Sequence, residues 1–292
     1  MVHSALVDNS HPAARPPRER QAGPSRLERA RGEARIGFVS VDGRSRLADL
    51  YQSGAAKIRL PRGERGATPE AVFLNTAGGV TGGDRLAFSV SVGDEARAVA
   101  TTQAAERIYR RSASVGEITT RLSVGPGARL DWLPQETIIF DCSALLRTLD
   151  AEIAPDATFI GVEAVVLGRT AMGETIRECS VRDSWRIRRG GQLVFADSLR
   201  IDGNAAGIMA GPATGRGAAA FATLVLLAPD AESRIDLARA ALDGRSGDAG
   251  VSAWNGMLVA RLAARNGQGL RADLVRLIEA LRATAMPRVW NC

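Results

Sequence analysis

The chain carries an internal repeat in which a strand, a tight turn, an alanine and a second strand follow one another. The turns of three copies end at Ala96, Ala128 and Ala157, which are 32 and 29 residues apart. Apolar and polar residues alternate on both sides of each turn, as they do in half-buried β-strands. A fourth copy turns at residues 190–191. This spacing is the length of one supersecondary unit, so the repeat predicts stacked units, with a chance similarity among unrelated hairpins as the alternative.

We expect a mainly β fold of stacked antiparallel strands, in which each unit forms a hairpin-like pair and the sheets are layered as in a β-helix. Residues 230–242 and 270–281 carry apolar side chains at helical spacing and predict about two C-terminal α-helices. Residues 201–217 are rich in Gly, Ala and Pro and predict a flexible loop that could order on a partner. Residues 35–292 are therefore expected to form a single β domain with C-terminal helices.

The positive charge of the chain is concentrated at its beginning. The formal net charge is +6, and Lys57 is the only lysine among the 292 residues. Residues 1–34 are rich in Arg and Pro and lack the apolar segment of a secretory signal, which predicts a disordered leader. An arginine-rich nucleic-acid-binding protein is the alternative that this composition leaves open. We expect no nucleic-acid binding, because no aromatic residues for base stacking lie among the leader arginines.

Composition and cysteine spacing set the expected compartment. Hydrophobic residues make up 45% of the chain and charged residues 24%, which is typical of a folded soluble protein. The longest apolar run, residues 218–228, is shorter than the roughly 20 residues that a membrane helix needs, so no membrane association is expected. Cys142, Cys179 and Cys292 are odd in number and lack CxxC spacing, which indicates neither a disulfide framework nor a zinc site. We expect a cytoplasmic protein.

Residues 74–111 contain the most constrained loop in the sequence. Paired glycines indicate positive φ or the close approach of a group that a side chain would block. A phosphate cradle needs Gly-Lys-Ser/Thr, or a G-x-G-x-x-G segment that opens a helix, whereas here Gly-Gly-Asp precedes a strand. A structural double turn and, more weakly, a phosphate-ligand enzyme stay open as interpretations. The residues that define this loop and its partner segment are Gly78, Gly79, Gly82, Gly83, Thr101 and Thr102.

Histidine is missing from the expected folded body. The two histidines, His3 and His11, lie in the leader. A Ser-His-Asp triad, a Cys-His pair and a histidine zinc site all need an imidazole in the folded part. The sequence therefore predicts a protein that is not an enzyme of these classes.

Carboxylates remain as groups that can hold a ligand or a metal. An acidic residue in an apolar strand is costly unless it is paired or lines a wet cavity. At recurring places in stacked repeats, such oxygens could line one channel and bind a metal weakly and transiently. The neighbouring Arg85, Arg107 and Arg169 provide the alternative, in which the carboxylates form structural salt bridges. The candidates are Asp84, Glu106, Glu136, Asp141, Glu163 and Asp197.

Five ordered blocks of the sequence resemble the urease accessory protein D family, also called UreD or UreH. They are LNTAGGVTGGD (74–84), TTQAAERIYR (101–110), WLPQETIIF (132–140), VLGRTAMGE (166–174) and PRVW (287–290). The resemblance covers roughly residues 34–290. The arginine-rich leader matches none of these blocks.

The resemblance implies a non-enzymatic chaperone for urease, an enzyme of nitrogen metabolism. Such a scaffold binds the urease apoprotein on one side and the accessory protein UreF on the other, and UreF holds the GTPase UreG. GTP hydrolysis then releases nickel, which passes through an internal tunnel to the urease active site. The resemblance implies no permanently bound cofactor, only transient Ni²⁺.

The resemblance also assigns roles to some of the candidate carboxylates. Asp84, Glu163 and Asp197 match acidic positions associated with the tunnel, and Thr101 and Glu106 belong to one motif block. Relatives can carry a smaller polar residue in place of Glu106. The other two, Glu136 and Asp141, are assigned to the nickel path from their chemistry alone. Oxygen ligands hold borderline Ni²⁺ more loosely than imidazole or thiolate does, which suits an ion in transit.

Overall fold

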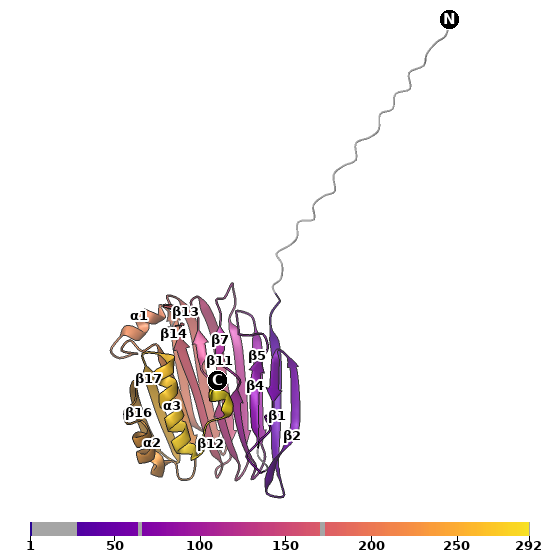
Figure 1. The fold of residues 1–292 in the computed structure, drawn as a ribbon, viewed down its shortest axis with the longest axis vertical. Helices are drawn as coiled ribbons and strands as arrows, with labels where there is room; N and C mark the ends of the chain where they lie inside the picture. Colours follow the sequence, from indigo (N-terminus) through magenta and orange to yellow (C-terminus); the bar gives the residue numbers. More distant parts are fainter. Residues whose placement is uncertain (2–27, 64–65, 170–172, 292) are drawn as a thin grey trace.

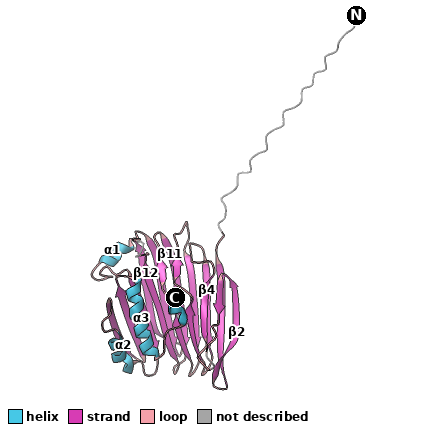
Figure 2. Cartoon of the chain, viewed as in Figure 1, coloured by secondary structure: helices cyan, strands magenta, loops and turns pink. Residues whose placement is uncertain are grey.

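The protein is built from two β-sheets that lie face to face, with helices on the outer face of one of them (Figures 1 and 2). The computed structural model describes residues 1, 28–63, 66–169 and 173–291. Sheet A has the strand order β14-β13-β11-β8-β5-β1-β2. Its strands are β1 (Arg31–Val41), β2 (Arg44–Gly54), β5 (Arg85–Val92), β8 (Gly116–Val124), β11 (Ser143–Ile153), β13 (Cys179–Arg189) and β14 (Gln192–Gly203).

Sheet B has the order β16-β17-β15-β12-β9-β6-β4-β3, and two short strands, β7 and β10, pair beside β12. Its strands are β3 (Ala56–Arg59), β4 (Glu70–Asn75), β6 (Arg97–Thr102), β7 (Glu106–Ile108), β9 (Arg129–Leu133), β10 (Thr137–Ile139), β12 (Thr158–Leu167), β15 (Ala220–Leu227), β16 (Asp248–Trp254) and β17 (Met257–Ala264). The helices are α1 (Ala205–Ala210), α2 (Ile235–Ala241) and α3 (Gly267–Arg282), with 3₁₀ turns η2 (Glu232–Arg234) and η3 (Arg288–Asn291).

Each of the first three repeat units crosses from sheet A to sheet B at its turn. The three turn alanines are at most 1% exposed, because each sits at a corner between the sheets. Their amides close the turns by donating to Gly93, Gly125 and Ala154. Successive turns are in register, since Arg129 N donates to Ala96 O and Thr158 N donates to Ala128 O, both at 2.9 Å. The repeat therefore forms stacked coils that pass through both sheets.

The prediction of a mainly β fold with stacked, layered sheets and C-terminal helices is confirmed, but the expected strand direction is not. The central pairs β1–β5, β5–β8, β8–β11 and β11–β13 of sheet A are parallel, as are β4–β6, β6–β9 and β9–β12 of sheet B. A chain that alternates between sheets returns to each sheet in the same direction. Antiparallel pairs such as β1–β2 and β12–β15 lie toward the edges.

The hairpin-like pairing expected for every unit is correct only for the fourth copy. There β13 and β14 pair antiparallel across Gly190 and Gly191, which both have positive φ, as the tight turn of a hairpin requires. In the other copies the two strands of a unit lie in different sheets. Gly and Pro turns are compatible with both geometries, so the turn residues alone did not distinguish a hairpin from a crossing.

The C-terminal part adds a third layer to the molecule. Leu270, Leu274, Leu277 and Ile278 of α3 are fully buried, together with residues of β15 and β17 such as Leu226. The helix expected over residues 230–242 is a 3₁₀ turn followed by α2. The hairpin β16–β17 between the helices was not among the predicted elements. The two apolar clusters place sheet B between sheet A and the helices.

Two expected irregular segments differ from the structure. Strand β14 continues to Gly203, and α1 follows because the side chain of Asn204 accepts the amide of Gly207. Residues 201–217 are therefore only partly a loop. Most of the leader predicted over residues 1–34 lies outside the described residues, and β1 begins at Arg31. Within the described ranges, none of the helices combines the length and apolar character needed to traverse a bilayer.

The corner alanines generate the first testable prediction. Replacing Ala128 by Val adds two methyl groups at a site that is 1% exposed between the sheets. Overpacking of this kind should lower the free energy of unfolding by about 1–3 kcal/mol. Urea denaturation measures the change. Ala196→Val at an exposed position of β14 is the control and should stay within about 0.5 kcal/mol. Equal effects of the two substitutions would contradict the corner role.

Candidate functional site

A cavity of about 150 Å³ lies between the two sheets and opens beside the loops that follow β4 and β6. Three of the blocks recognised in the sequence contribute to its wall. The first block supplies Asn75 and Gly78, the second supplies residues 102–107, and the third supplies Trp132 and residues 134–135. These blocks are about 30 residues apart in the chain and meet because successive coils stack in register.

The cavity changes character from its outer end to its inner end. The outer end is bordered by exposed Gly78, Gln103 and Ala104. The inner end is lined by the buried side chains of Trp132, Arg147, Glu163, Phe73 and Phe88. The space can hold several water molecules next to polar partners. Two of the six candidate carboxylates, Glu106 and Glu163, line this cavity.

Glu163 lies on β12 at the inner end and is 7% exposed. Its Oε2 is 2.5 Å from Nη1 of Arg147, and its Oε1 accepts the indole N–H of Trp132 at 3.3 Å. Burial raises the pKa of Glu163 to about 7, with a smaller contribution from Asp183, while Arg147 and the hydrogen bond from Trp132 act in the opposite direction. This carboxyl group therefore titrates near neutral pH.

Arg147 connects the two sheets. It lies on β11 of sheet A, and its Nη2 is 2.5 Å from Oδ2 of Asp183 on the neighbouring strand β13. Nη1 also donates to Oγ1 of Thr137 at 2.8 Å. Burial alone would lower the pKa of Arg147, but the charges of Asp183 and Glu163 outweigh it and raise the pKa. The guanidinium is therefore charged at every accessible pH.

Glu106 begins β7 near the outer end of the cavity. Its two carboxylate oxygens accept the side-chain amide of Asn75 at 3.1 and 3.3 Å, and Oε1 also accepts the backbone amide of Arg107. Burial raises its pKa, whereas the hydrogen bonds from Asn75 and Arg107 act in the opposite direction. Because its hydrogen-bond partners carry no charge, Glu106 differs from Glu163 in having no ion pair within the described part of the chain.

Two further candidates are held by backbone amides away from the cavity wall. Asp84 closes the glycine loop, where its Oδ1 accepts the amide of Ala30 and its Oδ2 accepts the amide of Thr81, both at 2.8 Å. Asp141 accepts the amides of residues 177 and 178 at 2.8 and 3.0 Å. The bond from the amide of Glu178 is the largest cause that lowers the pKa of Asp141. In this geometry both carboxylates fix loops, and the assignment of either to a nickel path stays a prediction.

The last two candidates are paired with arginines from other elements. Asp197 on β14 lies 2.9 Å from Nη2 of Arg261 on β17, also away from the cavity wall. Glu136 is 7% exposed, and its Oε2 is 2.7 Å from Nη1 of Arg271 on α3. The alternative of structural salt bridges applies to these two residues and to Glu163, although the pairing arginines differ from the neighbouring ones expected. Arg85 pairs with Glu117 and Arg169 with Glu174.

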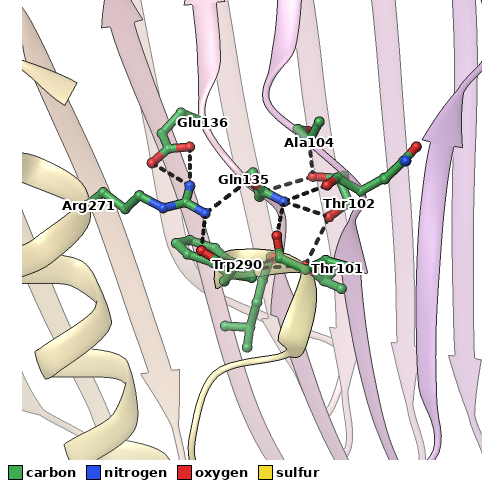
Figure 3. Close-up of polar contacts among 10 residues, drawn as sticks. Thr101, Thr102, Ala104, Gln135, Glu136, Arg271 and Trp290 are labelled. Carbon is green, nitrogen blue, oxygen red and sulfur yellow. Dashed lines mark hydrogen bonds and ion pairs between the residues drawn. The ribbon is translucent and has the colours of Figure 1, made fainter. Parts of the chain in front are cut away.

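Glu136 belongs to a polar cluster that we call the C-terminal clasp, formed by Thr101, Gln135, Glu136, Arg271 and Trp290 (Figure 3). Arg271 Nη2 donates to the Gln135 side chain at 3.1 Å and to the carbonyl of Trp290 at 2.6 Å. The indole N–H of Trp290 in turn donates to Thr101 Oγ1 at 3.1 Å, and its ring lies 4.6 Å from the Arg271 guanidinium. The clasp holds the C-terminus against the end of β6.

The clasp is joined to the cavity through one side chain. Gln135 lines the cavity, and its Nε2 donates to the carbonyls of Thr102, Gln103 and Val289 at 3.2, 2.8 and 3.0 Å. Thr102 Oγ1 also accepts a hydrogen bond from the backbone N–H of Gln135. The clasp thereby fixes the loop that precedes Glu106, and the closing block of the sequence helps to shape the cavity.

The glycine loop packs closely against the next coil. A side chain at Gly79, where φ is +153°, would collide with the ring of Tyr109, and one at Gly82 would collide with the carbonyl of Ser114. Val80 N donates to the carbonyl of Arg107 at 2.8 Å, which ties the loop to β7. The loop therefore positions the outer wall of the cavity through its backbone.

Sequence reasoning missed three side chains at or beside the inner end: Arg147, Asp183 and Trp132. Strand alternation contained the signal for the first two. Arg147 shares its face with Leu145 and Leu149, and that face points into the core. A charged residue on an apolar strand face indicates a buried ion pair. Among the described residues, no group of three or more His, Cys, Asp or Glu side chains is arranged to hold a metal ion.

A family model described as UreD urease accessory protein matches residues 30–291. The chain belongs to the UreD family. A urease accessory protein UreD of Rhizobium leguminosarum bv. trifolii (strain WSM2304) is 50% identical over 271 residues, which cover 92% of this chain and 98% of the relative. The proteins of the same name from Methylobacterium sp. (strain 4-46) and Azorhizobium caulinodans are 49% and 42% identical, each over 92% of this chain and 98% or 99% of the relative. As a UreD protein, the chain has an accessory role in urease maturation.

The pKa of Glu163 predicts a pH-dependent stability for this UreD chain. The ordinary pKa of 4.5 is raised to about 7, so the folded chain keeps a proton that the unfolded chain releases. The resulting stabilisation is complete below pH 4.5 and is lost as the pH rises through 7, on the order of 3 kcal/mol in total. Glu163→Gln cannot titrate. The free energy of unfolding of wild type relative to this variant should therefore fall from pH 5 to pH 8 in urea titrations.

The control for this experiment is Glu152→Gln, an exposed glutamate on β11. The free energy of unfolding of wild type relative to Glu152→Gln should not fall comparably from pH 5 to pH 8. A difference between wild type and Glu163→Gln that is constant from pH 5 to pH 8 would contradict the raised pKa.

The clasp predicts a second effect on stability. Arg271→Met leaves Glu136 buried without its counter-charge, which should lower the free energy of unfolding by about 2–4 kcal/mol. The double variant Arg271→Met/Glu136→Gln removes the stranded charge and should regain part of the loss in the same denaturation assay. Arg239→Met, which removes an exposed ion pair with Asp236, is the matched control and should change little. No recovery in the double variant would argue against the ion pair as the cause.

Proposed function

We propose that this UreD protein is a non-catalytic scaffold that passes Ni²⁺ through the cavity between its sheets during urease maturation. The observation that carries the proposal is the position of two carboxylates in one cavity, half-buried Glu106 near the outer end and buried Glu163 at the inner end. Oxygen ligands of this kind bind Ni²⁺ more weakly than imidazole or thiolate ligands do. Weak ligands suit cargo that must leave again, so no resident metal or cofactor is part of the proposal.

The proposed partners are the urease apoprotein, UreF and, through UreF, the GTPase UreG, in the cytoplasm. Membership of the UreD family supports an assembly with urease-related proteins. The loops beside the cavity opening offer one surface on which a partner could dock. In this arrangement the sheets form the conduit and the clasp keeps its outer wall in place.

Reconstituted urease activation tests the proposal. The apoprotein, the other accessory proteins, nickel, bicarbonate and GTP are combined with or without this chain, and urease activity and bound nickel are measured. Wild type should activate, and Glu106→Gln/Glu163→Gln should assemble normally but deliver nickel at least fivefold more slowly, because both oxygen ligands of the cavity lose their charge. Glu152→Gln, on the exposed outer face of sheet A, should behave as wild type.

The outcomes separate the parts of the proposal. Equal activation with and without the chain would exclude a role in maturation under these conditions. Normal delivery by the double variant would exclude the cavity carboxylates while leaving the scaffold role. Asp84→Ala provides a further comparison. It removes the acceptor of two backbone amides, so we expect it to reduce stability by about 1–3 kcal/mol rather than delivery by the folded complex.

A further inference from the structure

Three charged side chains meet between the sheets at the inner end of the cavity, and two of them, Arg147 and Glu163, form part of its wall. Arg147 and Asp183 are neighbours in register on β11 and β13 of sheet A, and Glu163 faces them from β12 of sheet B. Arg147, Glu163 and Asp183 are 4%, 7% and 7% exposed. Thr137 on β10 adds a hydroxyl oxygen 2.8 Å from the guanidinium. Two carboxylates and a hydroxyl therefore surround a single buried cation.

This cluster does not have the bonding of an optimised structural ion pair. Within the described residues, Arg147 Nε and Asp183 Oδ1 are buried without a hydrogen-bond partner. An unpartnered buried polar atom is costly, and two carboxylates exceed the single positive charge of one guanidinium. Asp183 Oδ1 thus lacks a donor, and when both carboxylates are ionised their charge exceeds that of the guanidinium. A divalent cation would supply the missing charge, since carboxylate and hydroxyl oxygens are its ordinary ligands.

The cluster is also connected to the solvent-accessible part of the molecule. Arg147, Glu163 and Thr137 all line the same cavity that opens near Glu106. An ion that enters at the outer end and moves inward therefore meets Glu163 already paired with the guanidinium of Arg147. Glu163 lines the cavity but Asp183 does not, and the guanidinium of Arg147 lies between them, so an ion that binds both carboxylates must take the place of the guanidinium.

We propose that Arg147 occupies a latent divalent-cation site formed by Glu163, Asp183 and Thr137, and that an entering cation binds there only by displacing the guanidinium. The inference rests on the proposed passage of nickel through the cavity and assigns its regulation to Arg147. The arginine competes with the metal for the same oxygens, so the ion is held briefly. Without the arginine, the same oxygens become a storage site.

Nickel binding to the full-length chain tests this site directly. Equilibrium dialysis against NiCl₂ at pH 7.5, followed by metal analysis, compares wild type with Arg147→Met, which keeps much of the side-chain volume and removes the charge. The variant should bind one equivalent of Ni²⁺ at least tenfold more tightly than wild type. The triple variant Arg147→Met/Glu163→Gln/Asp183→Asn should lose this gain. Equal binding by wild type and Arg147→Met would overturn the proposal, and so would a gain that persists in the triple variant.

If Arg147→Met fails to fold because it removes the buried positive charge, Arg147→Lys provides a second variant for the test. It retains a positive charge, but an ammonium group lacks the planar fork that contacts Glu163 and Asp183 together. Circular dichroism verifies the fold, and this variant should bind Ni²⁺ at least threefold more tightly than wild type. Unchanged binding by folded Arg147→Lys would also overturn the proposal. Added NiCl₂ should raise the melting temperature of the tighter-binding variant more than that of wild type.

Failure of this inference can be distinguished from failure of the proposed function. Slow nickel delivery by Glu106→Gln/Glu163→Gln, combined with unchanged Ni²⁺ binding by the Arg147 variants, would exclude the latent site and still support passage of nickel through the cavity. Tight Ni²⁺ binding by Arg147→Met, combined with normal nickel delivery by Glu106→Gln/Glu163→Gln, would establish a cation site and exclude the cavity carboxylates from nickel passage.

Discussion

The stacked coils of this protein depend on the passage of the chain from one sheet to the other at three corners, each occupied by a buried alanine. Ala96, Ala128 and Ala157 fill these corners, and their backbone groups bond to the next corner in the stack. The corners fix the register of both sheets at once, because the strand on either side starts from the same turn. They also set the separation of the sheets and hence the space in which polar side chains can lie.

The register of the coils explains why motifs that are distant in the sequence form one site. Asn75 bonds Glu106 across 31 residues, Trp132 bonds Glu163 across 31, and Gln135 bonds Thr102 across 33. These separations repeat the spacing of the corner alanines. Side-chain contacts in the cavity are therefore contacts between equivalent positions of adjacent coils, and one insertion in a coil would displace the partners on both sides of it.

The sequence contained the period and the alternation, and these predicted a layered β fold. They could not reveal the pairing direction, because a Gly-Pro turn is compatible with a hairpin and with a crossing between sheets. Alternation along β11 places Arg147 on the core face. The sequence could therefore have predicted a buried arginine as a counter-charge for Glu163, but this prediction was not made. The partner of Glu136 was not accessible from the sequence, since Arg271 is 135 residues away and approaches only after α3 packs on sheet B.

The six acidic candidates show that the partner of a carboxylate decides what it can do. Asp84 and Asp141 accept backbone amides, and Glu136 pairs with an arginine of the clasp. A metal at these groups would have to compete with bonds that hold the fold. Glu106 lines the cavity and accepts hydrogen bonds from uncharged donors. Glu163 lines it too, but is paired with Arg147, which also pairs with Asp183. In the proposed passage of nickel, an ion moving inward would meet first a carboxylate that it can approach directly and then one for which it must compete, an order that would favour entry followed by release over capture.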